Sequence, residues 1–257
     1  MAQLKLNDIS VYFGGLKALS EVSFSLEAGE IVGLIGPNGA GKTTIFNVIT
    51  GVYQATKGDV ALDGASLRGK RPFQILTRGI ARTFQNIRLF SKMTALENAM
   101  VARHCRSKKG VVGAIFRTAS QRREERRIRE KALEALTFMG VDQYADTVAS
   151  NLPYGLQRRL EIARALASQP KVILLDEPAA GMNPAESSEL MNDISRISEL
   201  GIDVLLVEHD MKVVMGVCNR IVCVDHGVKI AEGTPGQIQS NPQVIEAYLG
   251  QPADQNN

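Results

Sequence analysis

The residues from Glu30 to Thr50 read EIVGLIGPNGAGKTTIFNVIT, and this stretch decides the fold. Its first part, EIVGLIG, is a short apolar run that ends in a glycine-rich turn, as a buried parallel strand does. The next part, GPNGAGKTT from Gly36 to Thr44, matches the pattern GxxxxGKT of a loop that binds phosphate. Because TTIFNVIT after it predicts a helix, the loop lies in the context that this pattern requires.

Each residue type in this loop suits the binding of a nucleoside triphosphate. The glycines allow backbone angles that turn successive N–H groups into one concavity, and the following helix adds its positive N-terminal end. Lys42 can reach the β- and γ-phosphates, and the Thr43 hydroxyl can ligate Mg²⁺. We therefore expect ATP and Mg²⁺ as cofactors. The residues expected to bind the nucleotide here are Gly36, Pro37, Asn38, Gly39, Ala40, Gly41, Lys42, Thr43 and Thr44.

A second stretch, KVILLDEP from Lys171 to Pro178, supplies acidic groups for the same site. Asp176 follows an apolar run and is placed to hold the Mg²⁺ shell, while Glu177 can orient or deprotonate the attacking water. Two adjacent acids at the end of a strand often only start a turn. The GKTT upstream makes that the weaker interpretation.

The periodicity along the chain predicts an α/β fold. The apolar runs 171–176 and 203–209 flank a helical pattern at 185–200, and strand, helix and strand in this order indicate a doubly wound parallel core. Alternating polar and apolar residues in LKLNDISVYF and VSFSLEAG predict antiparallel strands near the N-terminus. We expect a P-loop NTPase with a mixed central sheet, an N-terminal antiparallel β subdomain and an inserted α-helical subdomain.

We expect a single domain over residues 1–257. Its nucleotide-binding core is predicted at 1–92 and 168–235, its helical subdomain at 93–167, and a C-terminal helix and tail at 236–257. In the helical region, Ile128, Leu133, Leu136 and Met139 are predicted to share one face.

Composition excludes several classes of protein. The chain has 44% hydrophobic and 22% charged residues and a net charge of +3, and it has no apolar run of about eighteen residues that could cross a membrane. Its N-terminus lacks the basic and apolar blocks of a secretory signal, so we expect a cytosolic protein. Its three cysteines form no disulfide or metal-binding pattern. The basic stretches 106–110 and 117–127 suit a solvated face better than nucleic acid, since glutamates interleave and aromatic residues are few.

Three further motifs occur in a fixed order with the two above: VYFGG, TFQNIRLF and VEHDM. Each one alone is weak, but together they resemble the motifs of ATP-binding cassette (ABC) ATPases over nearly the whole chain. The resemblance implies that Gln85 contacts Mg²⁺ and water and senses a membrane partner, and that His209 contacts the γ-phosphate. It also implies that Phe13, with Tyr12 as the alternative, stacks on adenine.

The stretch NLPYGLQRRLEIARAL resembles the family's signature, LSGGQ followed by QRxxxARAL, but departs from it. In the family this motif begins a helix and grips the ATP held by a partner domain. Gly155 is retained, whereas Pro153 and Tyr154 replace the usual Ser and Gly. Pro153 removes a hydroxyl and an N–H group, so we expect the composite site that uses this signature to be slow. Asn183 stands where the family usually has Asp, which leaves other contacts across the dimer open.

Stretches such as FGGLKAL, LLDEPAAGMNP and GTPGQIQSNPQVIEAYLG resemble the ATP-binding subunits of bacterial importers for branched-chain amino acids, the longer of the two kinds. This implies a heterodimer with a second ATP-binding subunit, although a homodimer in isolation stays open. It also implies two membrane permeases, a periplasmic binding protein acting indirectly, and a place at the cytoplasmic face of the inner membrane, without nucleic acid.

Three alternatives remain at this point. Similar subunits serve importers of urea or other small amides, and this chain would not touch the substrate. A soluble ABC ATPase that acts on nucleic acid or ribosomes is a second reading, but such proteins usually have two cassettes or a long coiled-coil insertion. A switch that binds ATP without hydrolysing it is the third, and Glu177 and His209 argue against it because such a switch needs neither.

Overall fold

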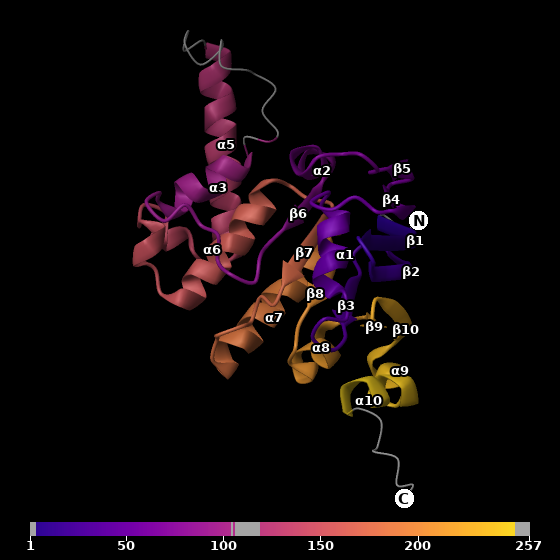
Figure 1. The fold of residues 1–257 in the computed structure, drawn as a ribbon. Helices are drawn as coiled ribbons and strands as arrows, with labels where there is room; N and C mark the ends of the chain where they lie inside the picture. Colours follow the sequence, from indigo (N-terminus) through magenta and orange to yellow (C-terminus); the bar gives the residue numbers. More distant parts are fainter. Residues whose placement is uncertain (1–3, 104, 106–118, 250–257) are drawn as a thin grey trace, which may run out of the picture.

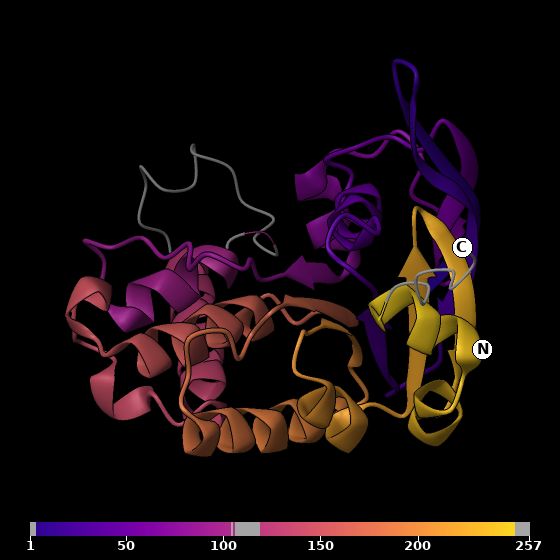
Figure 2. The same cartoon turned by 60° about the horizontal axis from the view of Figure 1, so that its bottom comes forward.

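The computed structural model describes residues 4–103, 105 and 119–249, which form two β-sheets and a helical part (Figures 1 and 2). The basic stretch 106–110, the first residues of the stretch 117–127 and residues 250–257 of the predicted C-terminal helix and tail lie outside the described residues. Among those described, no helix is both long enough and apolar enough to cross a membrane.

The central sheet has six strands in the order β10, β9, β3, β8, β7 and β6. Neighbouring strands are parallel except for β10, which is antiparallel to β9, so the sheet is mixed as predicted. Every residue of β3, β7 and β8 is buried, because helices or the second sheet cover both faces. The strands are β3 (Ile31–Ile35), β6 (Ile80–Arg82), β7 (Val172–Asp176), β8 (Asp203–Val207), β9 (Arg220–Asp225) and β10 (Val228–Gly233).

The second sheet is antiparallel and has the order β2, β1, β4 and β5. Its first two strands are the pair predicted from alternating residues, whereas β4 and β5 were not predicted. Apolar residues of this sheet, of the central sheet and of helix α1 form one core cluster, in which Phe46 is fully buried. The elements are β1 (Leu4–Phe13), β2 (Leu16–Leu26), α1 (Lys42–Ile49), β4 (Lys57–Leu62) and β5 (Ala65–Ser66).

Helices α3, α5 and α6 pack together beside the central sheet, where the sequence predicted a helical insertion. The predicted apolar face of α5 is confirmed, since Ile128, Leu136 and Met139 are buried and Leu133 packs against the same core. The exact subdomain boundaries remain a prediction. The main helices after α1 are α2 (Pro72–Arg78), α3 (Ala95–Arg103), α5 (Ala119–Phe138), α6 (Tyr154–Ala167), α7 (Pro184–Glu199) and α8 (Met211–Val217).

The C-terminal part contains two short helices, α9 (Pro235–Gln239) and α10 (Pro242–Leu249), where the sequence predicted one. Their caps explain the break. Thr234 caps α9 in a capping box with Gln237, and the Asn241 side chain accepts a hydrogen bond from the Gln243 N–H. Because Asn241 and Pro242 together favour a helix start, the chain begins a new helix there.

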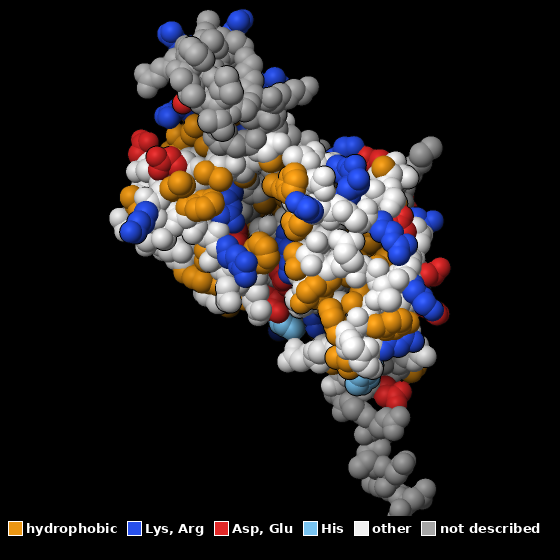
Figure 3. All heavy atoms as spheres, turned by 45° about the horizontal axis from the view of Figure 1, so that its top comes forward, with side chains coloured by type: hydrophobic (Ala, Val, Ile, Leu, Met, Phe, Trp, Pro, Cys, Tyr) orange, Lys and Arg blue, Asp and Glu red, His pale blue; other side chains and the backbone are white. Residues whose placement is uncertain are grey.

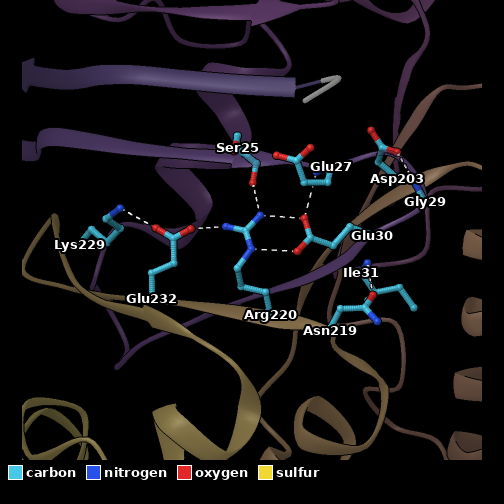
Figure 4. A network of polar contacts seen from close by, with 10 residues as sticks. All are labelled: Ser25, Glu27, Gly29, Glu30, Ile31, Asp203, Asn219, Arg220, Lys229 and Glu232. Carbon is cyan, nitrogen blue, oxygen red and sulfur yellow. Dashed lines mark hydrogen bonds and ion pairs between the residues drawn. The ribbon is translucent and has the colours of Figure 1, made fainter. Parts of the chain in front are cut away.

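Arg220, at the start of β9, joins the two sheets (Figure 4). Its Nε and Nη2 atoms donate to the Glu30 carboxylate at 2.8 and 2.7 Å, and Nη2 also donates to the Ser25 carbonyl of β2 at 2.6 Å. Its Nη1 atom pairs with Glu232 of β10, which Lys229 also contacts. A bidentate pair of this kind fixes orientation as well as distance. The residue before β3 is therefore held between both sheets.

Asp203, the first residue of β8, lies near this network and is fully buried. One carboxylate oxygen accepts the Gly29 N–H at 2.8 Å, and the other has no hydrogen-bond partner in the described part of the chain. The pKa of Asp203 is raised to about 6, mainly by burial and also by the negative charges of Asp63, Glu30 and Glu27, against the lowering effect of the Gly29 N–H. The protonated carboxyl is thus favoured in the folded chain.

This pKa gives a pH dependence that the variant Asp203→Asn removes. The folded pKa lies above the value of about 3.9 for an unfolded chain, so Asp203 contributes stability that is complete below pH of about 4 and is lost as the pH rises through about 6. We expect the wild-type chain to lose on the order of 1–2 kcal/mol relative to the variant across this window, allowing for solvent screening.

Urea unfolding of both chains at several values between pH 4 and pH 8 measures the difference directly. Since the amide oxygen of Asn can still accept the Gly29 N–H, the variant retains the observed hydrogen bond. A difference in stability that stays constant with pH would contradict the raised pKa.

Candidate functional site

The predicted phosphate loop lies between β3 and α1, and its shape requires glycine. Gly36 has a φ of 151°, and a Cβ atom there would stand 2.0 Å from the Val224 carbonyl oxygen. Gly41 has a φ of 106°, and its Cβ atom would stand 2.7 Å from the Leu19 side chain. No side chain caps the start of α1. The first N–H groups of this helix therefore suit an anionic group such as phosphate.

Lys42, the first residue of α1, folds back over the loop. Its Nζ atom donates to the carbonyl oxygens of Gly36 and Pro37 at 2.5 and 2.9 Å. Burial lowers the pKa of this ammonium group, and nearby negative groups, Glu177 foremost, raise it. The loop thus holds a buried cation beside the acidic residues at the end of β7.

Asp176 ends β7 and is held by Arg82, which the sequence analysis missed. Arg82 donates from Nη2 to Asp176 at 2.9 Å and from Nη1 to the Asn47 side chain at 2.7 Å. Its guanidinium group lies over the rings of Phe46 and Phe84, 5.2 and 4.9 Å from their centroids. The signal in the sequence was an arginine that ends the short run IAR, two positions before Phe84. Arg82 fixes the acid that was predicted to hold Mg²⁺.

Glu177 brings together the three residues predicted to be catalytic. One of its oxygens accepts a hydrogen bond from Gln85 Nε2 at 2.7 Å, and the other contacts His209 Nε2 at 2.5 Å. Its backbone has a φ of 48°, which is uncommon for a residue with a side chain and costs on the order of 1–3 kcal/mol. The Glu177 N–H donates to the Val207 carbonyl at the end of β8, which holds this conformation in place.

Glu208 is a further buried acid of the site that the sequence analysis did not single out. Its carboxylate accepts the N–H groups of Ala179 at 2.8 Å and of His209 at 3.3 Å. Burial raises the pKa of Glu208, and these two N–H groups lower it. The acid in VEHDM thereby fixes the loop that follows Glu177 as well as the start of the segment that bears His209.

The signature stretch forms the start of α6. Pro153 is the N-cap residue, and its carbonyl accepts the Gln157 N–H at 2.9 Å. Gly155 is the second residue of the helix, and a Cβ atom there would lie 3.1 Å from the Glu186 carboxylate. This close contact favours glycine at position 155, independently of the role predicted for Gly155.

Asn183, which departs from the family pattern, caps α7. Its side chain accepts the Glu186 N–H at 2.9 Å, and the Glu186 carboxylate accepts the Asn183 N–H at 3.0 Å. This reciprocal capping box stabilises the start of the helix. Asn183 therefore stabilises the start of α7 within its own chain.

Phe13, predicted to stack on adenine, lies at the end of β1 and is 45% exposed. It packs edge to face on Tyr53, with centroids 5.1 Å apart and an angle of 73°. Tyr12 is also exposed, so the structure leaves both aromatic residues available. Among the described residues, no hydrogen bond, ion pair or ring contact joins Phe13 or Gly155 to the cluster around Glu177.

The predicted Mg²⁺ ligands suit that ion only together with a nucleotide. In the part of the chain that the structure describes, no group of three or more His, Cys, Asp or Glu residues could hold a metal ion. The predicted set of Thr43, Gln85 and Asp176 offers one carboxylate. Mg²⁺ usually takes one or two carboxylates and completes its shell with waters and phosphate oxygens, so this donor set fits it.

Tyr248 connects α10 to the phosphate loop. Its hydroxyl accepts the Gly36 N–H at 2.9 Å, and burial raises the pKa of this hydroxyl to about 12, against the lowering effect of the Gly36 N–H. The hydroxyl is therefore neutral at physiological pH. The C-terminal segment in this way ties down the first residue of the loop, which the sequence analysis did not predict.

A mixed α/β sheet with a phosphate loop after one strand and an acidic pair after another defines a P-loop ATPase. The model of the family described as ABC transporter matches residues 19–180, and the one described as branched-chain amino acid ATP-binding cassette transporter matches residues 228–254. A crystallised ATP-binding cassette of an ABC transporter in its ADP conformation is 34% identical, with a TM-score of 0.84, over 98% of this chain and 100% of that one.

Curated relatives are similar over nearly their whole length. The high-affinity branched-chain amino acid transport ATP-binding protein BraF of Pseudomonas aeruginosa is 45% identical over 249 residues, 96% of this chain and 98% of the relative. The protein LivG of Escherichia coli, which has the same description, is 47% identical with the same coverage. The chain belongs to the ATP-binding protein family of ABC transporters.

The contact between α10 and the loop predicts the effect of Tyr248→Phe. This change removes the acceptor of the Gly36 N–H and retains the ring, so we expect a loss of about 1 kcal/mol of stability and a melting temperature lower by about 2–4 °C. Thermal unfolding measures both. Tyr144→Phe is the matched control, because this partly buried tyrosine packs through its ring and its hydroxyl makes no hydrogen bond to the residues that the structure describes. Equal melting temperatures for Tyr248→Phe and the wild type would refute the stabilising role.

Proposed function

We propose that this chain is the ATP-hydrolysing subunit that powers an importer of branched-chain amino acids. The support is that relatives described as transport proteins for these amino acids match over nearly their full length. A family model of the same description also matches the C-terminal segment 228–254, which contains Tyr248. The similarity therefore covers the C-terminal segment, which lies outside the ABC transporter match at 19–180, as well as the ATPase motifs.

In this proposal the loop 36–44 binds the phosphates of ATP, and Lys42 exchanges its contacts with loop carbonyls for the β- and γ-phosphates. Bound Mg²⁺ would neutralise phosphate charge, held through Thr43, Gln85 and Asp176. Glu177 orients the attacking water and accepts its proton as the water oxygen bonds to the γ-phosphorus. The bond to the bridging oxygen breaks, which releases ADP and phosphate.

Gln85 and His209 complete the proposed site, each at a different oxygen of the Glu177 carboxylate. Both contact its carboxylate, which accounts for their predicted places beside the water and the γ-phosphate. Phe13 or Tyr12 stacks on the adenine. Gln85 precedes the helical part of the chain, which supports a role for its segment in sensing a membrane partner.

The subunit works as one half of a pair of ATP-binding domains. Gly155 and the start of α6 would face the ATP of a second, shorter ATP-binding subunit, and only one of the two composite sites would use NLPYG. The absence of a serine at Pro153 makes that site the slower one. The pair lies under two permeases at the cytoplasmic face of the membrane, and a periplasmic binding protein delivers the substrate.

Nucleic acid is not part of the proposed function. On the face drawn in Figure 3, Lys and Arg side chains are scattered among hydrophobic and acidic ones rather than gathered into one stripe. The names of the relatives also favour amino acids over urea or amides as the transported substrate.

The role given to Glu177 predicts the behaviour of Glu177→Gln. The amide can still accept the hydrogen bond from Gln85, but it cannot take a proton from water, so we expect the ATPase rate to fall by at least about 100-fold with ATP binding retained. Phosphate release and equilibrium binding of labelled ATP measure the two quantities. Glu199→Gln, the same change on an exposed residue at the end of α7, serves as the control. Wild-type turnover in Glu177→Gln would remove Glu177 from this role.

The transport assignment predicts what purifies with the chain. From detergent-solubilised membranes of its own host, with ATP present, we expect two very hydrophobic proteins and a second, smaller ATPase. Vesicles reconstituted with this complex and the binding protein should take up leucine, isoleucine or valine when ATP is supplied, but not urea. Recovery from the soluble fraction alone, or with ribosomes or DNA, would overturn the assignment.

A further inference from the structure

Tyr154, which replaces a glycine of the signature, connects two parts of its own chain. Its hydroxyl donates to the Ala180 carbonyl at 2.9 Å and accepts a hydrogen bond from Arg158 Nη2 at 3.0 Å. Its ring lies against Gly181, where a Cβ atom would stand 3.2 Å from the nearest ring carbon. Tyr154 therefore joins the start of α6 to the loop that follows Glu177.

Arg158, one turn further along α6, holds the segment that contains Gln85. It is fully buried and donates to the carbonyl oxygens of Phe84 at 2.8 Å and of Gln85 at 2.7 Å, and to Glu161 at 3.0 Å. Among the described residues, its Nε atom has no hydrogen-bond partner. A buried guanidinium group with an unsatisfied N–H group contributes little to the free energy of folding. The main effect of the Arg158 contacts is therefore to position the segment that contains Gln85.

The two segments that this pair holds both contact Glu177. The Gln85 side chain donates to the Glu177 carboxylate at 2.7 Å, and the Ala180 N–H donates to the Glu177 carbonyl at 3.1 Å. The contacts thus form a closed ring that runs from Glu177 through Gln85, Arg158, Tyr154 and Ala180 back to Glu177. Each link is a hydrogen bond within one chain.

We propose that Tyr154 and Arg158 are positioning residues for ATP hydrolysis, which set the Glu177 carboxylate by fixing the Gln85 and Ala180 segments. The proposal rests on the proposed role of Glu177 and extends it. Tyr154 then contributes to catalysis inside its own subunit, a task separate from the signature's contact with the partner's nucleotide. A misplacement of well under 1 Å at a catalytic carboxylate is enough to lower a rate.

The test is Tyr154→Phe in the assembled, purified complex, with Tyr144→Phe as the matched control. Losing the hydroxyl removes the bonds to Ala180 and Arg158 and leaves the ring on Gly181. We expect kcat for ATP to fall on the order of fivefold with KM unchanged within about twofold, because positioning of the water is impaired and ATP binding is not. A role in folding alone would lower the melting temperature and leave kcat unchanged, and that result would overturn the proposal.

A second measurement tests whether the effect passes through Gln85. In a Gln85→Ala background the side chain that touches Glu177 is already gone, so we expect Tyr154→Phe to lower the residual kcat by less than twofold. The same fivefold fall in both backgrounds would overturn the proposed route through the Gln85 side chain.

Different results would overturn the catalytic role of Glu177 and the positioning role of Tyr154 and Arg158. If Glu177→Gln abolishes turnover and Tyr154→Phe retains wild-type kcat, the role of Glu177 stands and the positioning role falls. If Glu177→Gln turns over like the wild type, the catalytic assignment and the positioning role fall together. Transport of a substrate other than branched-chain amino acids would overturn the substrate assignment and leave the ATPase measurements of Tyr154 valid.

Discussion

The parallel pairing of β3, β8 and β7 is the constraint on which the site depends. Asp176 is aligned with Val207, the last residues of β7 and β8, and β3 pairs with the other edge of β8. Because parallel strands point the same way, all three deliver their carboxyl ends to one edge of the sheet. The phosphate loop, the acidic pair and the histidine segment therefore meet there, although more than 130 residues separate the first from the second.

Burial of β3, β7 and β8 stabilises that arrangement and also restricts where polar side chains can lie. The three strands have no exposed residue, and their charged side chains lie only at their termini, Asp203 at the start of β8 and Asp176 at the end of β7. There each polar group has a specific partner: Arg82 for Asp176, Gln85 and His209 for Glu177, and Ala179 for Glu208. At the buried carboxylates of Asp176 and Glu208, an unpaired charge costs more than any one of these bonds contributes. The site is a network in which few groups can be changed alone.

The sequence predicted the parts of this network that follow from local pattern. Apolar runs located β3, β7 and β8, alternation located β1 and β2, and the glycine and acidic motifs located Gly36 and Glu177. Short elements such as β5 and β6 escaped, because two or three residues give no measurable period. The split between α9 and α10 escaped because its cause is one Asn side chain.

Residues whose importance lies in contacts distant along the chain were the ones missed. Arg82 meets Asp176 across 94 positions, and Arg158 meets Gln85 across 73. Tyr154 was read only as a lost glycine, although its hydroxyl bonds to a loop 26 residues further along. No periodicity or spacing rule encodes such pairs. They depend on which strand ends the sheet topology brings together.

The fold of Lys42 over its own loop has a consequence for how strongly a nucleotide can be held. Its ammonium group already donates to two carbonyl oxygens of the loop, so arriving phosphates exchange one set of bonds for another. The contribution of Lys42 to nucleotide affinity is then the free-energy difference between its bonds to phosphate and its bonds to the loop carbonyls. This difference is smaller than the direct attraction between Lys42 and phosphate. Such an exchange suits an ATPase, which must release ADP as readily as it binds ATP.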